Sequence, residues 1–520
     1  MKTRTNTALV LAIAAALGAQ TVAAETFSVS NTNDSGPGSL RQALADAQAN
    51  GEADIIELSA ISGQTINLTS GQLEIEADDI TIQGNDVTLD AGGNSRVFLI
   101  SSQSDVELSD LSVTGGDATK NEEAFGGGIR VQQSDVSFAR LRVFNNQAGN
   151  GGGVQISGDG IEAELEGINI YDNVALGGYG GGLILNVENS DITIHSIEVH
   201  ANQSIEYEIP LGLSSENRFN ERGAAPFSPF IGGMGVAAEG SSSVVMEDLS
   251  IENNVADKEG GFLLLALDSA NIEISNFTVS GNQAQIDRGG LYVSADDYST
   301  VQINNFTVSS NDARFFPGMI AIARDDAIID LGSATITNNQ KTTSSGGTDA
   351  LGLEAFSESN GLIISTSVIA GNGSFYENDL VINASKGTAI IRYSLIGSQN
   401  LFGSISTDAT TDALTGLNAL LGPLADNGGP TRTHLPFTAS PLIDAVLFGQ
   451  AGCGTTLTTD QRGEVRPLDG ACDIGSVESR GVPQSVPVPV LSSMGLLLMA
   501  GLLGLAGVLG LRRLGSDKHL

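Results

Sequence analysis

The sequence has little of what catalytic and metal-binding sites usually require. Its 520 residues include four histidines, two cysteines and no tryptophan. No histidine stands in a Gly-His-Gly context and no G-x-S-x-G segment is present, which disfavours hydrolases built on a catalytic histidine or a serine nucleophile. His434, the histidine nearest to the cysteines, lacks ligand-like spacing to either thiol, so a zinc site is not indicated.

The two cysteines, Cys453 and Cys472, lie close together near the end of the protein body. In an oxidising compartment such a pair most simply forms one disulfide. Closing a loop of this length contributes about 3 kcal/mol of stability in the loop-entropy treatment. We therefore expect a Cys453–Cys472 bridge.

Basic residues are also few, with 24 Lys and Arg against 61 Asp and Glu and a formal net charge of −37. This charge disfavours nucleic acid and anionic membrane surfaces as partners and favours solubility. A solvated acidic surface explains the excess most simply, and loosely bound divalent cations such as Ca²⁺ are also compatible with it. No other cofactor and no fixed metal site are indicated.

Both ends of the chain carry apolar segments typical of targeting signals. Residues 1–24 have a basic start, an apolar run and a small-residue end, as cleaved secretory signal peptides do. Residues 491–511 are uncharged and long enough to cross a hydrocarbon core of about 30 Å. The tail 512–520 begins with Arg512 and Arg513, which places it in the cytoplasm before any processing. We expect an exported protein that is at least transiently anchored in a membrane.

What the sequence does contain is a phrase that recurs through residues 126–400. A glycine cluster, a short apolar strand, a second apolar stretch and an Asn-rich turn follow one another, as in the copy that opens with GGGLIL (180–185). The turn Asn recurs every 27–29 residues, apart from one step of 52, at positions 146, 173, 202, 254, 282, 311 and 339. A fixed period of this length, with strands and tight turns but no long helix, predicts a parallel β-helix. About nine coils, spaced by ~4.8 Å, would occupy these residues.

The repeated residues have structural explanations. Asn tolerates the left-handed conformation, and its amide can bond the equivalent amide of the next coil. Glycine clusters permit sharp bends and close backbone approach. Upstream, residues 25–125 combine strand patterns with one helix candidate at 39–51, in which Ser39 is the N-cap. Such a helix would cover the open first coil.

One repeat is interrupted after Asn202 by an insert at residues 205–231. Aromatic and arginine side chains concentrated on one loop are candidates for ligand binding. These candidates are Tyr207, Arg218, Phe219, Arg222, Phe227 and Phe230. The alternative is an ordinary surface loop folded back over the coils.

Beyond the repeats, residues 401–480 lose the period and become rich in Pro, Thr and Asp. We expect a compact C-terminal cap here, closed by the disulfide. An extended linker at 481–490 separates this cap from the apolar span.

Several passages resemble bacterial families. SVSNTNDSGPGSLRQALADAQANG resembles the N-terminal region of secreted β-helix proteins named for a CSLREA motif, with Gly38 and Gln42 in place of its Cys and Glu. The GG-apolar and N-x-A phrases are similar to repeats of right-handed parallel β-helix surface proteins, including the polymorphic outer membrane proteins. LGPLADNGGPTRTHLP (421–436) and TDQRGEVRPLDGACDIGSVE (459–478) resemble the "choice-of-anchor" module that precedes varied sorting signals.

The C-terminus resembles an IPTL-type sorting signal, with Met494 where that family usually has Trp. The matching positions are Pro489, Leu491, Ser492, Gly495, Arg512 and Arg513. Together the resemblances imply an all-β, right-handed parallel β-helix with an N-terminal helical cap and a C-terminal cap. They also imply a location in the bacterial cell envelope or at the cell surface, or secretion after cleavage by a sorting peptidase. They imply no reaction, because one fold carries many functions.

Parallel β-helices also include polysaccharide lyases and hydrolases, whose chemistry needs convergent carboxylates. The adjacent acids of this chain are Asp78-Asp79, Asp296-Asp297 and Asp325-Asp326. Neighbouring strand residues point to opposite faces, so such a pair cannot converge on one ion and turn positions are the simpler explanation. We therefore favour a non-catalytic surface protein that binds an extracellular glycan or matrix partner. A polysaccharide lyase or glycoside hydrolase acting along a β-helix groove is the alternative.

Overall fold

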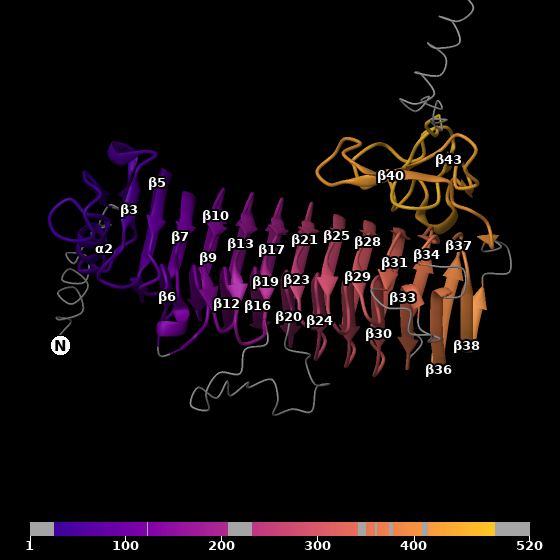
Figure 1. The fold of residues 1–520 in the computed structure, drawn as a ribbon, viewed down its shortest axis with the longest axis horizontal. Coiled ribbons are helices and arrows are strands. Elements are labelled where there is room, and N and C mark those ends of the chain that lie inside the picture. The colour runs from indigo at the N-terminus through magenta and orange to yellow at the C-terminus, as the bar shows by residue number, and fades with distance from the viewer. Residues whose placement is uncertain are drawn as a thin grey trace, which may run out of the picture. The chain divides into compact units, whose positions relative to one another are not determined.

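The computed structural model describes residues 25–121, 123–205, 231–341, 350–358, 361–373, 378–407 and 414–483. Two compact units are distinguished, 1–481 and 482–520, and the account below concerns the first. Strands make up 53% of the chain and helices 4%, which confirms the all-β prediction. About 12 turns of a parallel β-solenoid stack coil on coil (Figure 1). The signal peptide, the sorting signal and insert residues 206–230 lie outside the described residues.

Each coil contributes strands to three faces, here called A, B and C. Face A holds the strand that follows the glycine cluster. Its strands are β4 (Leu73–Glu76), β6 (Phe98–Ser101), β8 (Ile129–Gln132), β12 (Val154–Asp159), β16 (Leu183–Glu188), β20 (Met234–Glu239), β24 (Phe262–Ala266), β27 (Leu291–Ala295), β30 (Met319–Ala323), β33 (Ala350–Ser357) and the first parts of β36 (Asn378–Arg392) and β38 (Gln399–Thr407). The strands from β8 to β36 open the nine coils expected over residues 126–400.

Faces B and C hold the strands that follow in each coil, and in several coils one bent strand serves both. Face B comprises β1 (Thr26–Ser28), β2 (Asp54–Glu57), β9 (Asp135–Ala139), β13 (Glu162–Glu166), β17 (Asp191–His195), β21 (Ser243–Glu247), β34 (Leu362–Ser365) and the ends of β36 and β38. Face C comprises β3 (Thr65–Asn67), β10 (Arg142–Phe144), β14 (Asn169–Tyr171), β18 (Glu198–His200), β22 (Ser250–Glu252), β35 (Val368–Ile369), β37 (Leu395–Ile396) and β39 (Leu414–Thr415). The strands shared by both are β5 (Asp79–Asp90), β7 (Asp105–Thr114), β25 (Asn271–Ser280), β28 (Thr300–Ser309) and β31 (Ile328–Thr337).

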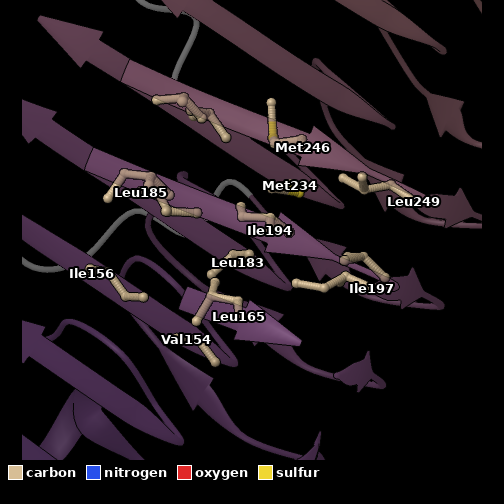
Figure 2. Close-up of a cluster of buried hydrophobic side chains, with 14 of the residues drawn as sticks. Val154, Ile156, Leu165, Leu183, Leu185, Ile194, Ile197, Met234, Met246 and Leu249 are labelled. Atoms are coloured by element: carbon tan, nitrogen blue, oxygen red, sulfur yellow. The ribbon is translucent and has the colours of Figure 1, made fainter. Parts of the chain in front are cut away.

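The interior is filled by every second residue of each strand. Leu183 pairs in register with Met234 on face A, and Ile194 pairs with Met246 on face B, so apolar side chains at equivalent positions of adjacent coils stack on one another. These side chains are almost completely buried and point into the space between the faces (Figure 2). Each buried side chain of this size contributes about 1.5–3 kcal/mol. The solenoid therefore owes its stability to contacts between adjacent coils.

The turn asparagines form the predicted ladder. In a representative step, Oδ1 of Asn173 accepts hydrogen bonds from the backbone N–H and from Nδ2 of Asn146, both at 3.0 Å. The same pattern continues through each turn Asn to Asn372 and ends on the carboxylate of Asp379. The expectation that these asparagines are themselves left-handed is wrong. The left-handed residue is the one before each ladder Asn, at 145, 172, 201, 253, 281, 310, 338 and 371, because that residue makes the sharp turn that sends the amide inward.

A second, two-residue ladder follows the asparagines. It comprises β11 (Gln147–Ala148), β15 (Val174–Ala175), β19 (Gln203–Ser204), β23 (Val255–Ala256), β26 (Gln283–Ala284), β29 (Asp312–Ala313) and β32 (Gln340–Lys341). The glycine clusters come next and lie against it. A Cβ on Gly152 would stand 2.6 Å from the carbonyl oxygens of Gly181 and Val174, so the predicted close backbone approach is confirmed.

The N-terminal cap contains helix α2 (Leu40–Gln48), which confirms the expected helix and its N-cap. Ser39 Oγ accepts from the backbone N–H of Gln42 at 3.2 Å. Arg41 is held by Asp34 and by the carbonyl oxygens of Gly71 and Gln72. Leu40 is buried. Ser39 therefore caps the helix, Leu40 packs in the core, and Arg41 bonds the helix to the first coils. Short 3₁₀ turns occur at η1 (Ser59–Ile61) and η2 (Ala118–Lys120).

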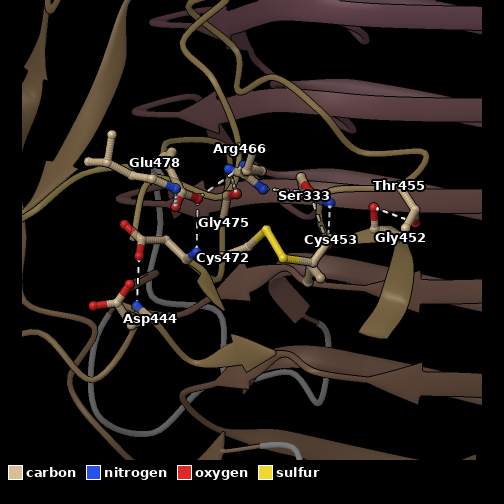
Figure 3. Close-up of a disulfide and its surroundings, with 12 residues drawn as sticks. Ser333, Asp444, Gly452, Cys453, Thr455, Arg466, Cys472, Gly475 and Glu478 are labelled. Atoms are coloured by element: carbon tan, nitrogen blue, oxygen red, sulfur yellow. Dashed lines mark hydrogen bonds and ion pairs between the residues drawn. A yellow bond between two sulfur atoms is a disulfide. The ribbon is translucent and has the colours of Figure 1, made fainter. Parts of the chain in front are cut away.

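A C-terminal module follows the last coil. It contains two antiparallel pairs, β40 (Leu421–Ala425) with β41 (Thr433–Pro436) and β42 (Val446–Leu447) with β43 (Ala471–Cys472), and the 3₁₀ turn η4 (Gln450–Gly452). The predicted Cys453–Cys472 disulfide is present and completely buried (Figure 3). Beside it Arg466 donates to Ser333 Oγ at 3.1 Å and lies 3.4 Å from the Glu478 carboxylate.

This module sits on face C rather than on the end of the solenoid. Thr278, for example, donates to the carbonyl oxygen of Arg432 at 2.7 Å, across 154 residues of sequence. The module contributes Arg432, His434, Gln461, Arg466 and Ser476 to the interface. The coils contribute Glu252, Thr278, Thr307, Ser309, Ser333 and Thr335. The strings that carry the choice-of-anchor resemblance thus have a structural role in this chain.

Candidate ligand-binding recess on face A

The ligand-binding residues proposed from the sequence cannot be placed. Tyr207, Arg218, Phe219, Arg222, Phe227 and Phe230 all lie outside the described residues. Of the insert, the structure describes Ile205, which is 40% exposed, and Ile231, which is buried. Ile231 lies beside face A, where it pairs with Glu259 of the next coil.

The adjacent acids lie in turns and bends of the coils. Asp296-Asp297 and Asp325-Asp326 occupy turns after β27 and β30, as expected, and Asp296 is paired with Arg324 at 3.4 Å. Asp78 precedes β5 in a bend. Within the described residues no group of three or more His, Cys, Asp or Glu side chains is placed to hold a metal ion.

Face B presents a column of carboxylates on five successive coils. They are Asp79, Asp105, Asp135, Glu162 and Asp191. Burial, followed by repulsion from Asp79 and Asp135, raises the pKa of Asp105. The column accounts for part of the acidic surface predicted from composition.

A small recess opens on the outward side of face A, with a volume of about 60 Å³. Its floor is formed by outward-pointing residues of β12, β16, β20 and β24. Its wall is formed by residues that precede the glycine clusters. The lining residues are Phe125, Asn150, Gln155, Tyr179, Ile184, Asn186, Ile231, Gly235, Val236, Ala237, Leu263 and Leu265.

The depth of the recess follows from the small residues of β20. Gly235 stands between Ile184 and Leu263 on the neighbouring strands, and Ala237 stands between Asn186 and Leu265. A Cβ on Gly235 would meet only the side-chain tips of Ile184 and Ile231, at 2.8 and 3.0 Å. The tips of Ile184 and Ile231 therefore close over Gly235 and form part of the lining of the recess.

The floor is apolar where an outward face would ordinarily be polar. Leu263 and Leu265 point outward yet are only 5% and 6% exposed, beside the inward-pointing Leu264. The sequence signal that could have revealed this is the unbroken apolar run FLLLA (262–266). Such a run marks a strand buried on both faces, unlike an alternating one.

Gln155 brings an unsatisfied polar atom to the recess. Its side chain is 6% exposed, and its Oε1 has no hydrogen-bond partner among the described residues. A buried unsatisfied acceptor costs about 1–3 kcal/mol. A ligand that donated an O–H or N–H to this oxygen would recover that energy.

An ion pair stands at each end of the recess. Arg130 pairs with Glu123 and lies over the ring of Phe125, with 5.0 Å from its guanidinium carbon to the ring centroid. Arg288 pairs with Glu259 and lies 4.1 Å from the ring centroid of Tyr292. Burial raises the pKa of Glu259 to about 7, against the opposing attraction of Arg288.

The arrangement suits recognition better than chemistry. Acid–base cleavage of a glycan ordinarily uses two carboxyl groups on either side of the bond. None of the described lining residues is charged, and the carboxylates at its two ends, Glu123 and Glu259, are each paired with an arginine. The recess thus offers apolar surface, amides and the unsatisfied Oε1 of Gln155, and the Nε groups of Arg130 and Arg288 at its ends also lack hydrogen-bond partners among the described residues.

Comparison of the chain with protein-family models, with curated proteins and with solved structures found no match. In the described part of the chain no helix is long and apolar enough to cross a membrane. The expected span at 491–511 lies outside that part.

Proposed function

We propose that this protein is an exported, non-catalytic β-helix that binds a glycan at the cell surface or in the surrounding matrix. The observation that carries the proposal is the face A recess, in which an apolar floor lies beside the amides of Asn150, Gln155 and Asn186. Sugar rings present an apolar C–H face and hydroxyl groups, which such a lining complements.

The location in the proposal is supported by the sequence at the two ends. The signal-like residues 1–24 support export, and the sorting-like residues 488–513 support anchoring or release by a sorting peptidase. The buried disulfide is of the kind that persists in oxidising compartments. Fractionation of the producing cells tests this part, because a protein recovered only from the cytoplasm would contradict it.

A polysaccharide lyase or hydrolase remains the second candidate, favoured by Glu259. A carboxyl group with a pKa of about 7 beside a groove has the titration behaviour of a general acid or base. If this candidate is right, Glu259→Gln should abolish glycan cleavage while leaving binding measurable.

One experiment separates the two candidates. The purified protein is incubated with polyuronates and with neutral glycans, with and without calcium, and both binding and product formation are followed. Saturable binding without product supports the binding function, whereas turnover of any glycan contradicts it. Deleting residues 206–230 tests the sequence-proposed binding residues separately, because unchanged binding would reduce that insert to a surface loop.

A further inference from the structure

Two buried acids near the N-terminal cap lack a counter-charge. Asp54, the first residue of β2, is 2% exposed, and Asp78, which directly precedes β5, is 7% exposed. In each of them Oδ2 is buried and has no hydrogen-bond partner among the described residues. No described lysine, arginine or histidine forms an ion pair with either acid. A buried carboxylate without a cation is costly, so this part of the first coils is suited to receive one.

The two acids also act on each other. Burial raises the pKa of Asp78, while the backbone N–H of Asp79 opposes this rise by donating to Asp78 Oδ1 at 3.0 Å. Repulsion from the negative charge of Asp54, and then from that of Asp79, raises this pKa further. A positive charge placed here would relieve the repulsion and favour the ionised carboxylates.

The backbone nitrogen of Glu25 already contacts this site. It donates a hydrogen bond to Asp54 Oδ1 at 2.9 Å. Glu25 directly precedes β1, and its carbonyl oxygen accepts from the backbone N–H of Ile55 at 2.9 Å. Thr26 pairs in register with Ile55, so the parallel pairing of β1 with β2 holds this nitrogen beside the Asp54 carboxylate.

Glu25 is also the first residue after the expected signal peptide, residues 1–24. Hydrolysis of the Ala24–Glu25 peptide bond by a signal peptidase consumes one water molecule. It leaves a carboxylate on Ala24 and, at neutral pH, an ammonium group on Glu25. The uncharged amide with one N–H thereby becomes a cation with three N–H donors.

We infer that cleavage after Ala24 creates the missing counter-charge, and that the new α-ammonium group of Glu25 binds the Asp54 carboxylate and fastens β1 to β2. This inference rests on the export part of the proposed function. Hydrogen bonds between ionised groups are about twice as strong as those between neutral ones. Cleavage therefore stabilises the N-terminal cap, and the cap is completed only after export.

The test uses the mature protein recovered from the producing cells, whose N-terminal residue is first identified by mass spectrometry. Acetylation of its α-amino group by acetic anhydride at pH 8 is then followed on the N-terminal peptide, with and without guanidinium chloride. The bond to Asp54 holds the pKa of this group above its ordinary value of about 7.7–8.0. Because only the uncharged amine reacts, we expect acetylation to be at least about fivefold slower in the folded protein than in the denatured one.

A pair of variants separates the charge of Asp54 from simple shielding of the amine. Asp54→Asn keeps the shape of the side chain and removes its charge, so acetylation of the folded variant should be severalfold faster than that of the parent. Glu76→Gln removes an exposed carboxylate on β4 and is the matched control, which should react as the parent does. Circular dichroism checks that both variants fold, and if Asp54→Asn does not, the comparison of folded with denatured parent protein decides.

The outcomes distinguish this inference from the function on which it rests. Equal acetylation rates in folded and denatured parent protein would overturn the inference and leave export intact. An N-terminal residue other than Glu25, or a folded Asp54→Asn protein that reacts as slowly as the parent, would do the same. Recovery of the chain with residues 1–24 still attached would overturn the export part of the proposed function as well.

Discussion

Arg432 and Glu252, 180 residues apart in the sequence, form a two-point ion pair that fastens the C-terminal module to face C. Arg432 Nε lies 3.0 Å from one carboxylate oxygen of Glu252, and a second guanidinium nitrogen contacts the other. The Glu252 side chain is 14% exposed and that of Arg432 is 41% exposed, so solvent screens the pair only in part. This contact lies at the N-terminal edge of the interface between the module and face C, because Glu252 belongs to β22 and the other contacts lie on later coils.

Arg432→Ala should therefore loosen the module more than it destabilises the coils. We expect a loss of about 1 kcal/mol in the free energy of unfolding, which is typical of a partly exposed, bidentate pair. Urea denaturation measures that loss, and limited proteolysis within residues 421–481 reports loosening of the module. Arg140→Ala removes the exposed two-point pair with Asp110 and is the control. Equal protease sensitivity of the two variants would argue against a fastening role.

Asn254→Ala should destabilise the solenoid strongly. The substitution removes the acceptor of the Asn202 backbone N–H and the donors to Val199 O and Asn282 Oδ1, all of them buried. Leaving such groups unsatisfied should cost about 3 kcal/mol. Asn271→Ala, whose amide bonds only the exposed Glu273, should change stability by less than about 0.5 kcal/mol. Similar urea midpoints for the two variants would show that the ladder contributes little.

Glu259 should make stability fall as pH rises towards neutrality. Burial raises its pKa to about 7 from its ordinary value of 4.5, so between these values the folded protein holds a proton that the unfolded chain has released. Below pH 4.5 this group therefore contributes on the order of 3 kcal/mol to the free energy of unfolding, and this contribution is lost by about pH 7.

Glu259→Gln should remove this slope, and above about pH 7, where Glu259 is ionised, it should also lower stability by leaving Arg288 without its counter-charge. The measurement is the free energy of unfolding from urea titrations between pH 4.5 and pH 7. Glu273→Gln, on the exposed side of face B, should keep the slope of the parent protein. A slope unchanged in Glu259→Gln would show that another group titrates.

The double substitution Cys453→Ser and Cys472→Ser should destabilise the module by about 3 kcal/mol, the loop-closure value for a loop of this length. The coils should stay folded, since their buried strands pair with one another and the disulfide lies outside them. Thermal unfolding followed by circular dichroism should then show an earlier transition for the module. A single transition at the parent temperature would contradict this expectation.

The fold could be predicted because every coil repeats the same sequence pattern. Each copy carries the glycine cluster, the apolar strand and the turn Asn, and stacking requires the same residue at the same place in every coil. The left-handed position was misplaced by one residue because Asn is common at both places, as the NN pairs at 145–146, 253–254 and 338–339 show. Only the direction of the amide distinguishes the two positions.

The recess and the interface between the module and face C could not be predicted from the repeat. Gln155, Ala237 and Leu263 come from three different coils, and nothing in a single copy shows that their outward sides form one hollow. Contacts such as Thr307 with Gln461 join residues 154 apart and follow no period. The run FLLLA at 262–266 was the available clue, since it breaks the alternation of an outward-polar strand.

The interface between the module and face C also determines how the protein responds to a pulling force. A pull on the chain at residue 483 enters through a module that side-chain bonds hold to β22, β25, β28 and β31, so these bonds share the load. A terminal coil pulled directly would be peeled away one backbone bond at a time. Because the module is attached to face C, a force applied to it is distributed over four coils of the solenoid and does not act on the last coil alone.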